Sequence, residues 1–184
     1  MEQEKGPIEL GDKKSYAGIP EAEFIEDVDS YMARPENGSK EEVLKKLDNQ
    51  YGKYKFMEFN LLSKKKRLQN QIPELKRSLT MIEKLEGQNE ECDTQFLLSD
   101  QVFAKAKIPP TKNVCLWLGA NVMLEYTLDD AKELLTQNIN TADRNLGYVN
   151  HDLDFLRDQF TTTEVNMARV FNWDVKRCQA QAAK

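Results

Sequence analysis

Apolar residues between Leu135 and Val170 recur at alternating spacings of four and three, which limits the possible folds more than any other feature. One column of this repeat holds Leu135, Ala142, Val149, Leu156, Thr163 and Val170, and the other holds Ile139, Leu146, Leu153, Phe160 and Met167. Such a repeat places one apolar stripe along an α-helix and is typical of coiled coils. We therefore expect a coiled-coil helix over residues 127–178, with Thr127 and Asp130 capping its start.

Residues 39–92 carry a weaker form of the same repeat. The main column is Leu47, Tyr54, Leu61, Leu68, Leu75 and Ile82, and four of the six companions, Leu44, Tyr51, Glu58, Lys65, Ile72 and Leu79, are apolar. Ser39 and Glu42 form a capping box that predicts the start of this helix. Pro73 lies inside the repeat, and the pattern leaves open whether it kinks the helix or marks a restart. A globular helical bundle is the alternative fold, but no third long helix is present to complete one.

The two predicted helices are of similar length, about 50 residues each, which favours an antiparallel pair folded back through the segment between them. Val43 would then lie near Val170, whereas parallel helices would bring Val43 close to Ala131. The next two places of the repeat after Val170 are Asp174 and Arg177. Because charged groups are costly to bury unpaired, apolar packing between the helices should end near Val170.

The segment between the helices, residues 94–126, has the pattern of two β-hairpins. Val102, Ala104, Ala106 and Ile108 alternate with other residues, and Thr94–Leu98 provides a pairing strand. Two further apolar runs, Val114–Leu118 and Val122–Tyr126, are joined across Gly119-Ala120-Asn121. The predicted fold is therefore mainly α with a small amount of β, with two hairpins inserted between two coiled-coil helices.

Two-stranded ribbons are marginally stable in water, and the run from Val114 to Leu118 is apolar on both faces. Unpaired strand edges of this kind call for strands from other chains. We expect the hairpins to form an assembly module whose contacts come from Val102, Ile108, Val114, Leu116, Trp117, Leu118, Val122 and Leu124.

The two ends of the chain are predicted from composition and periodicity. Residues 1–18 are polar and contain three glycines, so we expect a flexible tail, and residues 179–184 a second tail. Residues 19–34 are predicted as a short amphipathic helix with Phe24, Ile25, Val28 and Met32 on one face.

The net charge of −5 argues against nucleic acid as the main partner. No apolar run resembles a signal peptide or a membrane span, so we expect no membrane association. The run Lys64–Arg67 is interpreted as a solvated helix face rather than a nuclear-localisation signal. His151 and Asp152 are expected on the helix surface, and no arrangement of residues predicts catalysis, a metal or a cofactor.

Several unusual strings, among them "GIPEAEFIEDVDSYM", "LKKLDNQYGKYKFME", "VCLWLGANVMLEY" and "DLDFLRDQFTTTEVNMARVFNWDVKR", resemble the α-class subunits of the prefoldin family. The resemblance covers about residues 18–177. It implies a heterohexamer of two α-class and four β-class prefoldin subunits, in which the hairpins form a β-barrel and the coiled coils project as tentacles. The implied fold agrees with the one predicted from the heptad and strand patterns.

The resemblance also implies a function and its partners. Prefoldin captures unfolded actin and tubulin without ATP and delivers them to the cytosolic chaperonin, which places the protein in the cytoplasm and leaves the nucleus open as an additional location. The alternative is a coiled-coil adaptor that binds a folded partner, such as the von Hippel–Lindau ubiquitin-ligase component, a partner suggested by another name in this family.

The expected client-binding site is the helix end where the apolar repeat stops. Its residues are Val170, Phe171, Trp173, Phe24, Ile25 and Val28. Two interpretations stay open for Phe171 and Trp173, which leave the apolar stripe: they contact client, or they pack against the helix predicted over residues 19–34. Both hold if that helix docks loosely and competes with client.

Overall fold

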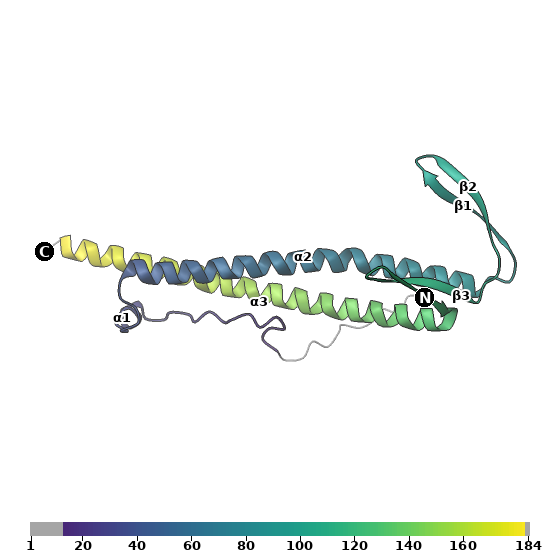
Figure 1. The fold of residues 1–184 in the computed structure, drawn as a ribbon. Coiled ribbons are helices and arrows are strands. Elements are labelled where there is room, and N and C mark those ends of the chain that lie inside the picture. Colours follow the sequence, from purple (N-terminus) through teal and green to yellow (C-terminus); the bar gives the residue numbers. More distant parts are fainter. Residues whose placement is uncertain (1–12, 183–184) are drawn as a thin grey trace. The chain divides into compact units, whose positions relative to one another are not determined.

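The computed structural model describes residues 13–182 and contains three helices and two β-hairpins over that range (Figure 1). The elements follow in the order α1 (Val28–Met32), α2 (Lys40–Glu86), β1 (Cys92–Ser99), β2 (Val102–Ile108), β3 (Asn113–Gly119), β4 (Val122–Thr127) and α3 (Leu128–Ala182). The chain divides into two compact units, one made of Met1–Arg67 with Asn145–Lys184 and the other of Leu68–Arg144. Both long helices contribute to both units.

The long helices are antiparallel within each unit, as the sequence predicts. In the first unit Val43 of α2 and Val170 of α3 belong to one buried cluster, and neither side chain is exposed to solvent. In the second unit Ile82, near the end of α2, packs with Ala131 and Leu135 at the start of α3. The mainly helical fold with two inserted hairpins is thereby confirmed.

The predicted heptad positions form the core between the helices. Those that are buried are Leu47, Tyr54, Leu61, Leu68, Ile72 and Ile82 on α2, and Leu135, Ile139, Ala142, Val149, Leu156, Phe160, Thr163 and Val170 on α3. Thr163 is a polar residue at a core position, and its hydroxyl donates to the Gln159 carbonyl one turn earlier, 2.8 Å away. Helix α2 is uninterrupted through Pro73, so a restart at this residue is excluded.

Both long helices begin with the predicted capping pairs. The Glu42 N–H donates to Ser39 Oγ, and the Ser39 N–H donates to Glu42 Oε2, each at 3.3 Å. At the start of α3 the Asp130 N–H donates to Thr127 Oγ1 at 3.2 Å. These bonds satisfy N–H groups that the first turn of a helix leaves without partners, and they fix where each helix begins. Helix α2 ends at Glu86, before the predicted limit of 92, while α3 continues through Ala182 into the predicted tail.

The two antiparallel hairpins share one design. In each, a two-residue loop follows a register shift, which falls between Leu97 and Ser99 in β1 and between Trp117 and Gly119 in β3. The loop of the second hairpin holds Ala120 and Asn121 at positive φ, 48° and 62°. Two successive left-handed residues match the right-handed twist of a hairpin. The predicted turn at 119–121 is therefore a tight two-residue connection.

The helix predicted over residues 19–34 is wrong over its first half. Residues 19–27 contain no helix, and α1 is a five-residue helix, Val28–Met32. The physical reason is that backbone N–H groups in this stretch bind side chains of α3 instead of carbonyls of their own helix. Residues 13–18, predicted as part of a flexible tail, also contact α3, and residues 1–12 of that predicted tail lie outside the described residues.

Over residues 13–182, no helix combines the length and the apolar character needed to cross a membrane.

Candidate functional site: the helix ends and the hairpins

The start of α2 and the late part of α3 meet in an apolar cluster, which we call the helix-end cluster. The cluster also includes residues of the N-terminal segment, which we define as residues 13–32. Buried members come from all three parts: Ile25 and Val28 from the N-terminal segment, Val43 and Leu47 from α2, and Val170 from α3. Tyr31, Met32, Leu44, Met167 and Trp173 pack around them, partly buried. The structure thus brings four of the six predicted tip residues, Ile25, Val28, Val170 and Trp173, into one cluster, and it buries the first three instead of presenting them to solvent.

Two aromatic side chains at this end stay open to solvent. Phe24 is 50% exposed and Phe171 is 53% exposed. Each is accompanied by a cation, with the Arg169 guanidinium 5.3 Å from the Phe24 ring centre and the Lys40 ammonium 5.1 Å from that of Phe171. Cations over aromatic faces are attracted electrostatically and leave the rest of the ring available for contact. Of the six predicted tip residues, these two form the accessible apolar surface.

Trp173 takes a mainly structural role. Its indole N–H donates to Asp29 Oδ1 at 2.5 Å, and the ring packs against the helix-end cluster. The Arg177 guanidinium lies 5.3 Å from the ring centre. The sequence left two interpretations open for these aromatics, contact with client or packing against the N-terminal segment. Trp173 packs against the segment, whereas Phe171 remains exposed to solvent.

An ion pair closes the core after Val170. The Lys40 ammonium donates to Asp174 Oδ2 at 2.6 Å, and both side chains are largely covered. This hydrogen bond raises the pKa of Lys40 above its ordinary value of 10.5, against the opposing effect of burial. The apolar repeat ends at Val170, as the sequence predicts. The next position of the repeat, Asp174, is paired with Lys40 of the other helix, so contact between the helices continues past Val170.

Three polar residues of α3, seven positions apart, hold the backbone of the N-terminal segment. Asp152 Oδ1 accepts from the Tyr16 N–H at 2.7 Å, Gln159 Oε1 from the Ala22 N–H at 2.8 Å, and Asn166 Oδ1 from the Ile25 N–H at 2.9 Å. All three side chains are buried, at 2%, 6% and 2% exposed. We call Asp152, Gln159 and Asn166 the polar ladder.

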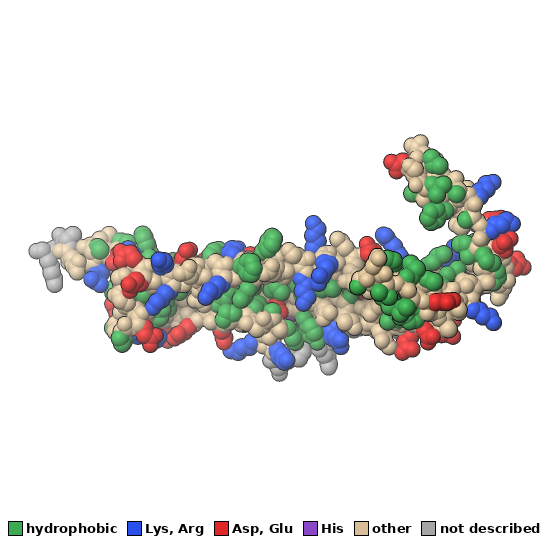
Figure 2. All heavy atoms as spheres, in the orientation of Figure 1, with side chains coloured by type: hydrophobic (Ala, Val, Ile, Leu, Met, Phe, Trp, Pro, Cys, Tyr) green, Lys and Arg blue, Asp and Glu red, His purple; other side chains and the backbone are tan. Residues whose placement is uncertain are grey.

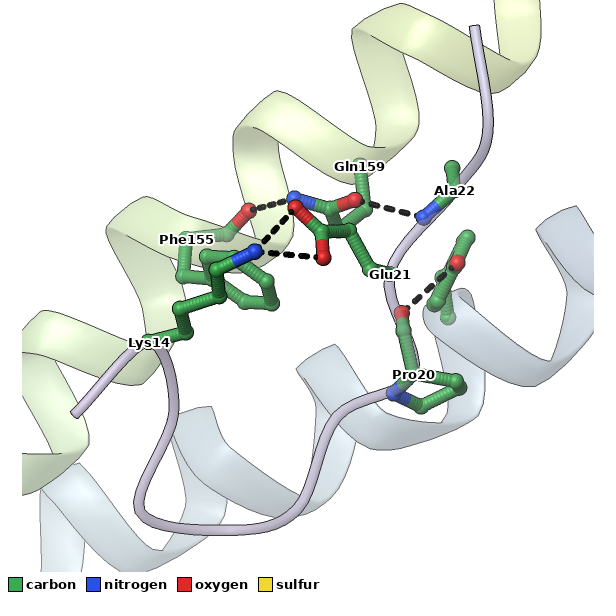
Figure 3. Close-up of polar contacts among 7 residues, drawn as sticks. Lys14, Pro20, Glu21, Ala22, Phe155 and Gln159 are labelled. Carbon is green, nitrogen blue, oxygen red and sulfur yellow. Dashed lines mark hydrogen bonds and ion pairs between the residues drawn. The ribbon is translucent and has the colours of Figure 1, made fainter.

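Donors from the helices bind carbonyls of the same segment. Asn166 Nδ2 donates to the Glu23 carbonyl at 2.7 Å, Arg169 to the Glu26 carbonyl at 2.7 Å, and the Tyr54 hydroxyl to the Pro20 carbonyl at 2.9 Å. Figure 3 shows the Gln159 side chain reaching from α3 to the Ala22 backbone, with the segment passing beside the helix. The helices thus recognise an irregular, non-helical stretch mainly through its main chain.

This ladder is not among the features predicted from the sequence. The prediction that Asp152 lies on the helix surface is wrong, because its carboxylate is buried and accepts from the Ser15 hydroxyl and the Tyr16 N–H. His151 is half-buried, with its ring centre 5.3 Å from that of Tyr16. A signal was present, since Asp152, Gln159 and Asn166 repeat every seven residues beside the apolar stripe and continue to Trp173. A polar column at heptad spacing indicates that something packs on that face.

The second hairpin has one covered face and one open face. Val114 and Leu116 of β3, with Tyr126 of β4, pack on the cluster formed by Ile82, Ala131 and Leu135. Trp117 points the other way and is 60% exposed. The structure therefore gives Val114 and Leu116 a partner within the chain, and it leaves Trp117, Leu118, Val122 and Leu124 accessible among the predicted assembly residues.

The first hairpin exposes apolar side chains at its loop end, where Figure 2 shows hydrophobic atoms on the surface. These residues are Phe96, Leu97, Leu98, Val102 and Phe103, each more than half exposed. Ile108 lies at the other end, where its carbonyl accepts from Gln88 Nε2 at 2.7 Å. Within the described part of the chain each sheet contains only its own two strands, so both hairpins have two unpaired edges. Over residues 13–182, no group of His, Cys, Asp or Glu is placed to hold a metal ion.

Comparison with known proteins identifies the fold. The family model described as prefoldin subunit matches residues 54–173. A prefoldin subunit 3 from Drosophila melanogaster is 60% identical over 168 residues, covering 91% of this chain and 87% of the relative. The chain belongs to the prefoldin family. A human prefoldin subunit 3 is 57% identical over 177 residues, covering 94% of this chain and 90% of the relative.

Among solved structures, a filamentous PFD from Methanocaldococcus jannaschii is similar with a TM-score of 0.44 at 16% identity, covering 72% of this chain and 98% of the other. Membership of the prefoldin family makes this chain a co-chaperone subunit that works with other prefoldin subunits. Prefoldin subunits are chaperones, not enzymes. The exposed hairpins and the helix-end cluster are therefore considered as surfaces for protein contacts.

Proposed function

We propose that this prefoldin chain is one subunit of a heterohexamer that captures unfolded polypeptides of the actin and tubulin class without ATP and passes them to the cytosolic chaperonin. The proposal includes two α-class and four β-class subunits joined through the hairpins into a β-barrel. It places the protein in the cytoplasm, with the nucleus as a further location.

The observation that carries client capture is the pair of half-exposed aromatics, Phe24 and Phe171, beside a cluster of buried apolar residues at the helix ends. Full burial of one such side chain contributes about 1.5–3 kcal/mol, so one helix end holds a client weakly. Several helix ends acting on one client gain avidity because the later contacts are intramolecular. In the proposed site, client contacts Phe171, Phe24 and Trp173 first, and Val170, Ile25 and Val28 only where the cluster opens.

Assembly is supported by the exposed apolar hairpin residues. Single-chain ribbons with free edges and exposed Phe96, Phe103 and Trp117 would be marginal alone, and strands from neighbouring subunits remove both defects. The second hairpin is anchored on its own helices through Val114 and Leu116. The neighbours are therefore proposed to contact its open face.

The experiment is suppression of aggregation by the complex reconstituted with other prefoldin subunits. Urea-denatured actin is diluted into buffer with wild-type complex or with the Phe171→Ser variant, and light scattering is followed. Wild-type complex should lower scattering, and the variant should need a higher concentration for the same effect. Binding of folded von Hippel–Lindau protein without any effect on actin aggregation would instead support the adaptor alternative and overturn the proposal.

A further inference from the structure

The N-terminal segment occupies the face of α3 that carries the polar ladder, and it does so chiefly with groups that every polypeptide has. Three of its N–H groups and three of its carbonyls bind side chains of the long helices. None of these six bonds uses a side chain of the segment, and side-chain bonds to α3 come from Ser15, which donates to Asp152, and Asp29, which accepts from Trp173. The face therefore binds main-chain groups of an irregular segment rather than a particular set of side chains.

Apolar anchors complete this recognition. Ile19, Ile25 and Val28 of the segment are buried at 7%, 4% and 9% exposed. Ile25 and Val28 reach the cluster with Val43 and Val170. Residues 13–27 have no regular secondary structure and carry an apolar residue every few positions, a description that fits most unfolded chains. Native proteins do not offer this combination, because their main-chain groups are already paired and their apolar residues are buried.

We propose that the polar ladder, together with the cluster residues of the long helices, Val43, Leu47 and Val170, forms a binding site for an irregular segment of a non-native protein, which takes the place of residues 13–32. This inference rests on the proposed function and names the conformation of client that this subunit selects. The N-terminal segment is then a built-in occupant that client must displace. Native proteins are rejected because they present no unpaired main-chain groups to the ladder.

The built-in occupant also sets how strongly a client must compete. The segment is joined to α2 by residues 33–39, so its effective concentration at the site is on the order of millimolar. A client must bind better than this internal competitor, which one weak apolar contact does not achieve. Clients held at several subunits at once pass this threshold, and isolated apolar peptides do not.

The first variant of the test is Ile25→Asp in the full chain, assembled with other prefoldin subunits. A carboxylate in place of the buried Ile25 is not tolerated in the apolar cluster, so the segment leaves while the ladder residues stay unchanged. Hydrogen exchange over residues 13–32 should become fast, which verifies the release. Ala17→Asp is the matched control, because it adds the same charge to the segment at an exposed position.

The readout is fluorescence anisotropy of labelled, urea-denatured actin with each complex. Ile25→Asp should tighten binding about threefold or more, because the competent site is no longer occupied, and Ala17→Asp should leave it unchanged. Unchanged or weaker binding by Ile25→Asp overturns the inference. If the wild-type complex does not bind denatured actin at all, the proposed function is overturned. If the wild-type complex binds actin and Ile25→Asp binds it no more tightly, only this inference is overturned.

The second variant adds Asn166→Leu to Ile25→Asp and tests main-chain recognition directly. In the released background Asn166 no longer has a buried partner to lose, so folding is little affected. If the ladder binds client main chain, loss of two hydrogen bonds should weaken actin binding about fivefold or more relative to Ile25→Asp. If client binding is only apolar, leucine adds apolar surface and binding stays the same or tightens, which overturns the inference.

Discussion

Asn166 on α3 and Ile25 in the N-terminal segment are joined by a hydrogen bond of 2.9 Å from the Ile25 N–H to Asn166 Oδ1. Both residues are buried, at 2% and 4% exposed. The same amide side chain donates to the Glu23 carbonyl at 2.7 Å, so one side chain satisfies two backbone groups of the segment. This contact explains why residues 19–27 are not helical, since their main-chain partners lie on another element.

Asn166→Ala should therefore release the N-terminal segment locally. It leaves the buried Ile25 N–H without a partner, at a cost of about 1–3 kcal/mol, and it also removes the donor to the part-buried Glu23 carbonyl. We expect hydrogen exchange at Ile25 to accelerate strongly while the α2 amides near Leu61 change little. The matched control is Asn150→Ala on the same helix, because the buried Asn150 Oδ1 has no hydrogen-bond partner. Equal exchange at Ile25 in both variants would contradict the ladder.

The two leucines Leu156 and Leu62 should respond differently to truncation. Leu156 of α3 is fully buried in the core between the helices, whereas Leu62 of α2 is 49% exposed. Leu156→Ala should lower the free energy of unfolding by about 2–5 kcal/mol, the range for a buried leucine that leaves a cavity. Leu62→Ala should cost well under half as much. Urea denaturation followed by circular dichroism compares them, and similar losses would show that the heptad core is misassigned.

The parts of the structure that are defined by local residue spacing can be predicted from the sequence. The long helices and their antiparallel pairing follow from heptad spacing, because burial of one stripe fixes direction and partner together. The hairpins follow from alternation and from the residues Gly119-Ala120-Asn121. The sequence does not predict which face of β3 is covered, because the strand is apolar on both sides. In the structure Leu116 lies on the covered face and Trp117 on the open face.

The N-terminal segment could not be predicted from local pattern. Ile25 and Val28 stand three positions apart, a spacing that suits a helix, and the short helix was inferred from it. The deciding interactions come from Gln159 and Asn166, more than 130 positions later, and local periodicity contains no information about them. Only the heptad spacing of the polar ladder residues gives a hint, because buried polar groups require partners.

Substitutions at Trp117 and Leu116 should have different effects, the first on assembly with other subunits and the second on the stability of the chain. Trp117→Ser removes an exposed side chain, so the isolated chain should keep its helicity while its incorporation into complexes with other prefoldin subunits falls. Leu116→Ser acts on the cluster beneath the hairpin and should lower the thermal stability of the chain itself. Native mass spectrometry and circular dichroism measure the two effects. Full incorporation of Trp117→Ser would contradict an assembly role for the open face.

Asn121 is suited to its turn by its left-handed backbone, with φ of 62°. Asn121→Val should destabilise the second hairpin by about 1–2 kcal/mol, because a β-branched side chain is strained at positive φ. Asn121→Gly should be neutral or slightly stabilising, since glycine adopts this conformation without a steric cost. Hydrogen exchange of β3 and β4 amides reports the difference. Equal protection in the two variants would mean that the turn backbone is not the one described.

The ion pair of Lys40 and Asp174 predicts an alkaline dependence of stability at the helix ends. The hydrogen bond to Asp174 raises the pKa of Lys40 above 10.5, which means that the folded chain holds this proton more tightly than the unfolded chain. The stabilisation is fully present below about pH 10 and is lost as pH rises through the raised pKa. Wild type and Lys40→Gln should therefore differ in melting temperature by a constant amount from pH 7 to about pH 9.5, and the difference should shrink above pH 10.5. Lys45→Gln is the matched control, because Lys45 is exposed on the same helix. A difference that grows with alkaline pH would contradict the pairing.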